Sequence, residues 1–186
     1  MRKRIIMIHG WGGTAGGDWL PWVKDKLKKK GFDVVVPEMP NTEEPKIEEW
    51  VNFLVELIGN VDENTFLIGH SIGCQAIMRY LEKIYPQKFG KIIFVAPWFN
   101  LNNLEDAESE EIAKPWIEVP IDLGKVKNSC DDINVLLSDN DLYVPLSDGE
   151  IFKEKLNANI IILKNKGHFT GDDDVLEFPE ILDLLI

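Results

Sequence analysis

Residues 65–74 read TFLIGHSIGC, and this stretch decides the fold. Thr65–Ile68 is a short apolar run typical of a buried strand, and a helical pattern begins at Cys74. Between them, Gly69-His70-Ser71-Ile72-Gly73 places a glycine two residues to either side of a serine. Side chains at those two positions would collide in a sharp turn, and glycine removes the collision. The stretch therefore predicts a strand, a strained turn that raises the Ser71 hydroxyl above a sheet, and a helix.

The same alternation of strand and helix patterns continues in both directions along the chain. Continuously apolar runs, which are typical of parallel strands covered on both faces, lie at Arg4–Ile8, Asp33–Val36, Thr65–Ile68, Lys91–Val95, Asn134–Leu137 and Asn159–Leu163. Helical periodicity occupies Trp19–Lys30, Ile47–Ile58, Cys74–Tyr85, Ser147–Leu156 and Val175–Leu185. We therefore expect an α/β fold, a three-layer α/β/α sandwich around a mostly parallel sheet of about six strands.

Length indicates one domain over residues 1–186. A chain of 186 residues can bury one continuous core, and no repeat or linker divides it. Only Trp98–Ser129, which includes the acidic stretch Leu104–Glu111, lacks a clear pattern. This segment has room for short helices, and we expect it to cross the surface near the functional site.

Charge and hydropathy exclude several classes of partner. The net charge is -12, which would repel a phosphate backbone and an anionic membrane surface, so we expect no nucleic-acid and no membrane partner. The basic run Lys24–Lys30 fits a solvated helix face. No apolar run approaches the roughly 20 residues of a membrane helix, and the first ten residues do not form a signal peptide. Two cysteines, Cys74 and Cys130, do not suggest a disulfide framework, and a cytoplasmic location is the prediction.

Ser71 stands in the G-x-S-x-G pattern of a nucleophilic serine, and such a serine needs a base. The chain has three histidines. His9 ends the first predicted strand, and His70 lies beside the serine and points the wrong way. His168, in Lys166-Gly167-His168-Phe169, follows the last strand at the carboxyl edge of the sheet, where sites of α/β proteins form. His168 is therefore the candidate base.

The base in turn needs an acid that orients its ring. Two acids, Asp139 and Asp141, lie in the loop 138–145 after the fifth predicted strand. We choose Asp141, which gives the chain order Ser71, Asp141, His168. Asp139 remains a competitor, because Asp in such loops often makes a turn through its own side chain.

Two main-chain N–H groups are the expected donors to a negatively charged carbonyl oxygen. Ile72 begins the helix after the serine, where helix N–H groups point at the site. The glycine-rich loop His9–Gly13 leaves the first strand at the same edge of the sheet, and its Trp11 N–H is the expected second donor.

We predict no cofactor and no metal. In the loop 9–13 the third glycine of the dinucleotide spacing G-x-G-x-x-G would fall on Ala15, which only looser forms of the fingerprint permit. No acid ends the second predicted strand at Val36-Pro37, and no Walker lysine follows the loop. The acidic triplet Asp172–Asp174 is placed where carboxylates favour the start of the last helix.

Taken together, five features resemble a known family. HGWGG, the pair Trp19 and Trp22, GHSIG, the loop SDNDxxVP and the final KGHF are similar to the small retinoblastoma-binding-protein-like serine hydrolases, also described as YdeN-like. The similarity covers nearly the whole chain. It implies an α/β-hydrolase fold without a large cap domain and a Ser71, Asp141, His168 triad. The family's name comes from one member's interaction with a retinoblastoma-type protein through an L-x-C-x-E motif. Neither Cys74 nor Cys130 has leucine two residues before it, so this partner is not expected here.

The function expected from these residues is acyl transfer. Such a serine would cleave a small-molecule ester, thioester or amide through an acyl-enzyme, and a small carboxylesterase is the specific expectation. Trp98 and Phe99, directly after the fourth strand, are the expected walls of an apolar substrate pocket. The alternative is a binding protein that keeps the fold without turnover.

Overall fold

Six strands form one parallel sheet in the computed structural model, which describes residues 3–104 and 106–186. Their order across the sheet is β2-β1-β3-β4-β5-β6. The bounds are β1 Arg4–Ile8, β2 Asp33–Val35, β3 Thr65–His70, β4 Lys91–Val95, β5 Ile133–Ser138 and β6 Asn159–Leu163. The expected α/β/α architecture, with a parallel sheet of six strands, is confirmed.

The strand order reverses between β1 and β3. The chain leaves β1 for the edge strand β2, and then returns past β1 to form β3. Ile8 is paired with Gly69, so the loops that follow β1 and β3 leave the sheet side by side. A crevice at such a switch point, outside the carboxyl ends of the strands, is where open α/β sheets bind ligands. The fold thus brings the loop His9–Gly13 next to Ser71.

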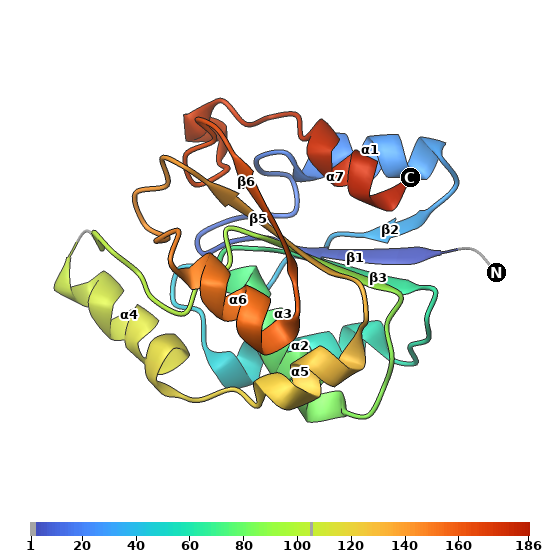
Figure 1. The fold of residues 1–186 in the computed structure, drawn as a ribbon, viewed down its shortest axis with the longest axis horizontal. Helices are drawn as coiled ribbons and strands as arrows, with labels where there is room; N and C mark the ends of the chain where they lie inside the picture. The colour runs from blue at the N-terminus through green and yellow to red at the C-terminus, as the bar shows by residue number, and fades with distance from the viewer. Residues whose placement is uncertain (1–2, 105) are drawn as a thin grey trace.

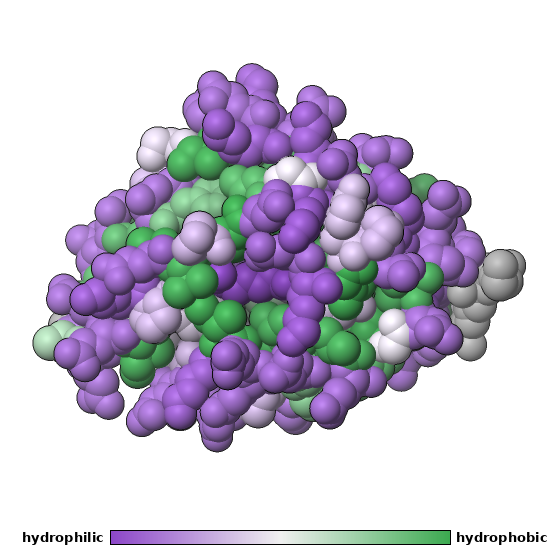
Figure 2. Space-filling view, turned by 90° about the horizontal axis from the view of Figure 1, so that it is seen from below, coloured by the Kyte–Doolittle hydropathy of each residue, from purple (hydrophilic) through white to green (hydrophobic). Residues whose placement is uncertain are grey.

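Helices cover both faces of the sheet (Figure 1). Helices α1 (Leu20–Lys29) and α7 (Pro179–Leu185) contact each other on one face. The other face carries α2 (Ile47–Ile58), α3 (Ile72–Ile84), α5 (Leu123–Ser129) and α6 (Asp148–Leu156). Figure 2 shows the molecule from this second side, where hydrophilic side chains dominate and hydrophobic ones appear between them. The core between the layers includes fully buried indoles at Trp19, Trp50, Trp98 and Trp116.

The segment 98–129 contains two helices that its sequence pattern did not reveal. Helix α4 (Ala107–Glu118) is capped by Asp106, whose carboxylate accepts the Ser109 N–H, and α5 follows it. Only Ala113 and Trp116 of α4 are buried, and Pro115 lies inside the helix. A helix with so few buried positions and an internal proline gives almost no apolar periodicity. Glu105, part of the predicted acidic stretch, lies outside the described residues.

The last helix begins four residues later than predicted. The pattern over Val175–Leu185 predicts one helix, but α7 starts at Pro179. Proline disfavours helical backbone in the preceding residue, and Phe178 has φ -137° and ψ 74°. The acidic triplet Asp172–Asp174 therefore does not begin this helix. It falls in and just after η1 (Gly171–Asp173), a short 3-10 turn.

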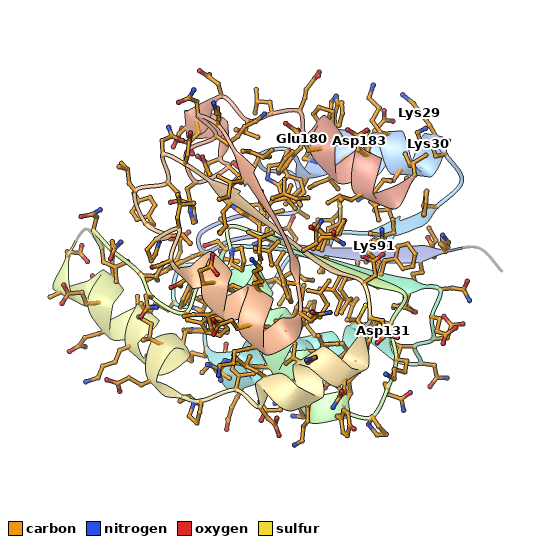
Figure 3. All side chains as sticks on the ribbon, in the orientation of Figure 1. Lys29, Lys30, Lys91, Asp131, Glu180 and Asp183 are labelled. Carbon is orange, nitrogen blue, oxygen red and sulfur yellow. The ribbon has the colours of Figure 1, made fainter. Side chains whose placement is uncertain are left out.

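The basic run on α1 lies beside acidic residues of α7. Figure 3 shows Lys29 and Lys30 on the same side of the sheet as Glu180 and Asp183. Lys29 also pairs with Asp25 of its own helix at 2.6 Å, with both side chains more than half exposed. This surface has the character of a solvated helix face. Among the described residues, no helix is long and apolar enough to cross a membrane.

Candidate active site

Ser71 occupies a strained turn between β3 and α3. Its backbone has φ 52° and ψ -120°, a conformation that residues with side chains rarely adopt. A Cβ at Gly69 would lie 2.8 Å from the main-chain nitrogen of Cys74, and a Cβ at Gly73 would lie 2.7 Å from the carbonyl oxygens of Ile8 and His9. The two glycines are therefore required for α3 to approach the ends of both β3 and β1.

A hydrogen-bonded chain joins Ser71, His168 and Asp141. Ser71 Oγ lies 2.9 Å from His168 Nε2, and Asp141 Oδ2 lies 2.8 Å from His168 Nδ1. A carboxylate only accepts, so Nδ1 carries the ring proton and Nε2 is free to accept from the serine hydroxyl. The Asp141 side chain is 2 % exposed and that of His168 15 %. The other oxygen of Asp141 accepts the N–H groups of Tyr143 and Val144, which fixes the carboxylate.

Of the two acids in the loop after β5, Asp141 meets the imidazole and Asp139 does not. Asp139 Oδ1 accepts the main-chain N–H of Asn165 at 2.8 Å. Ser138 Oγ accepts from Lys166 N, and Asn140 Oδ1 accepts from Gly167 N. These bonds join the loop that carries Asp141 to the loop that carries His168, so the two side chains are held in register.

Asp173 supports the histidine loop, and the sequence reasoning missed this role. Its Oδ2 accepts the main-chain N–H of His168 at 2.8 Å and the hydroxyl of Thr170 at 2.8 Å. The Thr170-x-x-Asp173 spacing of a capping box is the signal that could have found it. Gly167 has φ 51°, and a Cβ there would overlap the Asp173 carboxylate. A glycine directly before the histidine is therefore needed for this contact.

The remaining two histidines are buried next to the site and neither contacts Ser71 Oγ. His70 Nε2 lies 2.8 Å from the carbonyl oxygen of His168, to which it donates, and burial lowers the pKa of His70 to about 4. His9 lies between Gly10 O, 2.8 Å from Nδ1, and Met39 N, 3.1 Å from Nε2, and burial lowers its pKa. Both imidazoles are neutral near pH 7.

A cavity of about 370 Å³ opens over the serine. Its walls bring together the loop after β1, the serine turn, the segment after β4 and the loops after β5 and β6. They include Gly10, Trp11, Asp18, Glu43, Ser71, Ile72, Trp98, Leu101, Tyr143 and His168. Within the described residues, the main-chain N–H groups of Trp11 and Ile72 have no hydrogen-bond acceptor. Both predicted donors thus line the cavity with free N–H groups.

Of the two predicted pocket residues, the structure brings only Trp98 to the cavity. Phe99 is not among the lining residues, because its ring stacks on Phe152 of α6 with a centroid distance of 4.6 Å. Tyr143 does line the cavity, and its ring meets the His168 ring edge-on with a centroid distance of 5.3 Å. No periodic signal marks Tyr143, since it lies in an irregular loop.

Both cysteines are buried, which disfavours the reactive thiolate form. Cys74 is fully buried in α3, and burial raises the pKa of its thiol well above the ordinary value. Burial likewise raises the pKa of Cys130 to about 11. In the part of the chain that the structure describes, no group of three His, Cys, Asp or Glu side chains is placed to hold a metal.

The strand order and the serine on a sharp turn at the carboxyl edge of a parallel sheet define a small α/β-hydrolase fold. Comparison with known proteins also identifies the family. A family model described as serine hydrolase matches residues 5–186. The chain therefore belongs to the serine hydrolase family, and the resemblance read from its motifs is confirmed.

Two relatives match the chain along nearly its whole length. The protein YdeN of Bacillus subtilis is 28% identical over 186 residues, which cover 100% of this chain and 95% of YdeN. Serine hydrolase RBBP9 of Rattus norvegicus is 28% identical over 179 residues, or 96% of this chain and 90% of that protein. The crystal structure of the YdeN gene product superposes with a TM-score of 0.90, covering 98% of this chain and 96% of that one.

A more distant structure shares the fold alone. The 2-hydroxy-6-oxo-6-phenylhexa-2,4-dienoate hydrolase of Rhodococcus sp. strain RHA1 has a TM-score of 0.70 at 18% identity, covering 99% of this chain and 89% of that one.

Proposed function

We propose that this hydrolase cleaves small carboxylic esters through an acyl-enzyme on Ser71. The observation that carries the proposal is the hydrogen-bonded chain from Ser71 through His168 to Asp141, set in the cavity with two free N–H groups. In an activated serine the base must be within about 2.6–3.2 Å of the hydroxyl, and the 2.9 Å separation here satisfies that condition.

The proposed reaction has two halves. His168 Nε2 removes the hydroxyl proton as Ser71 Oγ attacks the carbonyl carbon, and the Trp11 and Ile72 N–H groups bind the resulting oxyanion. The intermediate collapses as the imidazolium gives its proton to the leaving alcohol, which leaves an acyl group on the serine. Water attacks the acyl-enzyme with His168 as base again, and the carboxylic acid departs as the Ser71 hydroxyl regains its proton. Asp141 stabilises the imidazolium in both halves.

The cavity supports a small, uncharged acyl group. Its volume of about 370 Å³ lies near the lower end of the roughly 300–1,000 Å³ of ligand pockets. Trp11, Trp98, Leu101 and Tyr143 give it apolar walls, whereas its charged lining residues, Asp18 and Glu43, are both acidic. An anionic acyl chain would be repelled by these carboxylates. Short aliphatic esters are therefore the proposed substrate class, with thioesters and amides as the competing substrate classes.

The test is steady-state hydrolysis of 4-nitrophenyl acetate, butyrate and decanoate, with thioester and anilide analogues of the butyrate. We expect the butyrate ester to be hydrolysed fastest and Ser71→Ala and His168→Ala to be inactive. The matched pair is Asp141→Asn and Asp139→Asn, since both change one carboxylate of the same loop. In serine proteases, loss of the orienting acid lowers kcat by about 10⁴-fold, and we expect a large loss of the same kind in Asp141→Asn. Asp139→Asn should stay near the wild-type rate.

Two results would overturn the proposal. Equal losses in the two asparagine variants would remove Asp141 from its role. A folded wild-type protein that hydrolyses none of these substrates, yet binds the butyrate in the cavity, would favour a binding protein that keeps the fold without turnover.

A further inference from the structure

The loop after β1 is held from behind by a buried histidine, and we propose that His9 is a positioning residue for the oxyanion site. This inference rests on the proposed function, because it concerns how the Trp11 N–H is aimed at the reacting carbonyl oxygen. His9 does not line the cavity, and its side chain is fully buried.

The protonation of the His9 ring follows from its two partners. Met39 N–H donates to Nε2 at 3.1 Å, so Nε2 carries no proton. The neutral ring must then carry its proton on Nδ1, which donates to the Gly10 carbonyl oxygen at 2.8 Å. Trp50 supports this arrangement, because its ring packs edge-on against His9 at 5.8 Å and its Nε1 donates to Pro40 O, next to Met39.

The orientation of the Gly10 carbonyl decides the orientation of the Trp11 N–H. The two groups belong to one planar trans peptide, so they point in opposite directions. The Gly10 oxygen is held from one side by His9 Nδ1 and by Gly13 N at 3.2 Å. The Trp11 N–H must therefore point away from His9. A Cβ at Gly10 would lie 3.6 Å from Ser71 Cβ, so this peptide lies directly beside the serine.

His9 is also fixed relative to the other oxyanion donor. A Cβ at Gly73 would lie 2.7 Å from both His9 O and Ile8 O, so the start of α3 packs against the end of β1. Ile72 supplies its N–H from this same turn. His9 thus packs its main chain against the start of α3 and bonds Gly10 through its side chain, so it lies between the two segments that carry the donors.

The experiment compares His9→Phe, His9→Asn and Gly13→Ala in the full-length protein. Phe keeps a ring against Trp50 and removes both hydrogen bonds, whereas Asn can present an amide N–H near the Nδ1 position. Gly13→Ala tests the same carbonyl without changing His9. Its Cβ would lie 3.0 Å from Gly10 O and 3.2 Å from His9 Nδ1, so one of them must move. Val126→Ala, a fully buried change in α5, serves as the control for lost stability alone.

The measurements are kcat and KM for 4-nitrophenyl butyrate and the inhibition constant of an alkyl trifluoromethyl ketone. This ketone forms a tetrahedral adduct on serine whose oxyanion needs the same donors as the reaction. Removal of an oxyanion donor costs about 10²–10³-fold in kcat, and misdirecting one should cost roughly 10- to 100-fold. We expect His9→Phe and Gly13→Ala to lower kcat by that factor, to weaken the ketone equally, and to leave KM nearly unchanged. His9→Asn should retain most of the wild-type kcat.

Three outcomes contradict the proposal. Wild-type kcat in His9→Phe would show that the bond to Gly10 is not needed. Stronger impairment of His9→Asn, which lacks the ring, than of His9→Phe, which keeps it, would attribute the effect to ring packing, and a rise in KM alone would attribute it to substrate binding. If His9→Phe does not fold, Gly13→Ala decides between the same outcomes. A wild-type protein without hydrolysis overturns the proposed function and this inference with it, whereas an active wild type with unaffected variants overturns only this inference.

Discussion

Asp148 anchors the segment that forms one wall of the cavity, and its removal should be costly. The residue is fully buried at the start of α6. Its carboxylate accepts Phe99 N at 2.6 Å, Asn100 N at 2.8 Å and Asn100 Nδ2 at 2.7 Å. These bonds hold the chain directly after Trp98. We therefore predict that Asp148→Ala lowers the free energy of unfolding and loosens the pocket.

The magnitude follows from the three contacts. A hydrogen bond to a charged group is worth about 1.5–3 kcal/mol, which gives a gross loss of about 6 kcal/mol for Asp148→Ala. About half of this loss of free energy is offset, because the variant no longer buries a carboxylate and water can reach the exposed Asn100. The expected net loss is about 3 kcal/mol. Asp148→Asn keeps an oxygen for both main-chain N–H groups but loses the charge and the acceptor for Asn100 Nδ2, so we expect about 1–2 kcal/mol.

The assay is urea unfolding followed by tryptophan fluorescence, with KM for 4-nitrophenyl butyrate as the second readout. Glu150→Ala is the matched control, since it removes an exposed acid from the same first turn of α6 and should change stability by no more than about 0.5 kcal/mol. KM should rise in Asp148→Ala while kcat changes less. Unfolding of Asp148→Ala within 1 kcal/mol of the wild-type protein, or equal losses for the Asn and Ala variants, would refute the reasoning.

Three further perturbations test the surroundings of the site. Gly167→Ala puts a side chain against the Asp173 carboxylate at a backbone φ of 51°. We expect the free energy of unfolding to fall by about 1–3 kcal/mol in thermal unfolding and kcat to fall at least tenfold. A wild-type kcat would contradict the placement of His168 by this loop. Because burial lowers the pKa of His70 from 6.5 to about 4, the unfolded chain binds a proton there that the folded chain does not, and stability falls as pH falls through this window. Between pH 6.5 and 5 the wild-type protein should lose about 1.5 kcal/mol more than His70→Gln in urea unfolding, and parallel pH curves would exclude a neutral buried His70. Arg79→Met removes the donors to Trp116 O and Val119 O at the end of α4, and it should lower the unfolding free energy by about 1–3 kcal/mol; an unchanged urea midpoint would mean that α4 is held by its other contacts.

Those parts of the fold whose packing leaves a strong local pattern could be predicted from the sequence. The four inner strands β1, β3, β4 and β5 are buried along almost their whole length and therefore read as apolar runs. Helix α4 shows the opposite case, because its two buried residues cannot produce periodicity over twelve positions. The start of α7 at Pro179 shows how a single residue moves a boundary that hydrophobicity alone does not mark.

In the candidate site, too, some residues could be predicted from the sequence and others could not. Ser71 could be predicted because glycines must flank it in the sharp turn. His168 and Asp141 could be predicted because the loops after parallel strands leave the sheet at the same edge. The Thr170-x-x-Asp173 spacing is a local signal for Asp173, whereas the Asp148 contact leaves no sequence signal, since it acts on main-chain N–H groups of a segment whose shape no sequence pattern reports. Phe99 was misplaced for a similar reason. It follows Trp98 directly, but its ring turns into the core against Phe152 and not into the cavity.

The most direct test of the central claim is covalent labelling of the intact protein with a fluorophosphonate, followed by mass spectrometry of its peptides. We predict one adduct per chain on Ser71, no adduct in Ser71→Ala and almost none in His168→Ala, with all three proteins equally folded by circular dichroism. A well-folded wild-type protein that takes up no label, or one whose label survives in Ser71→Ala, would contradict this claim.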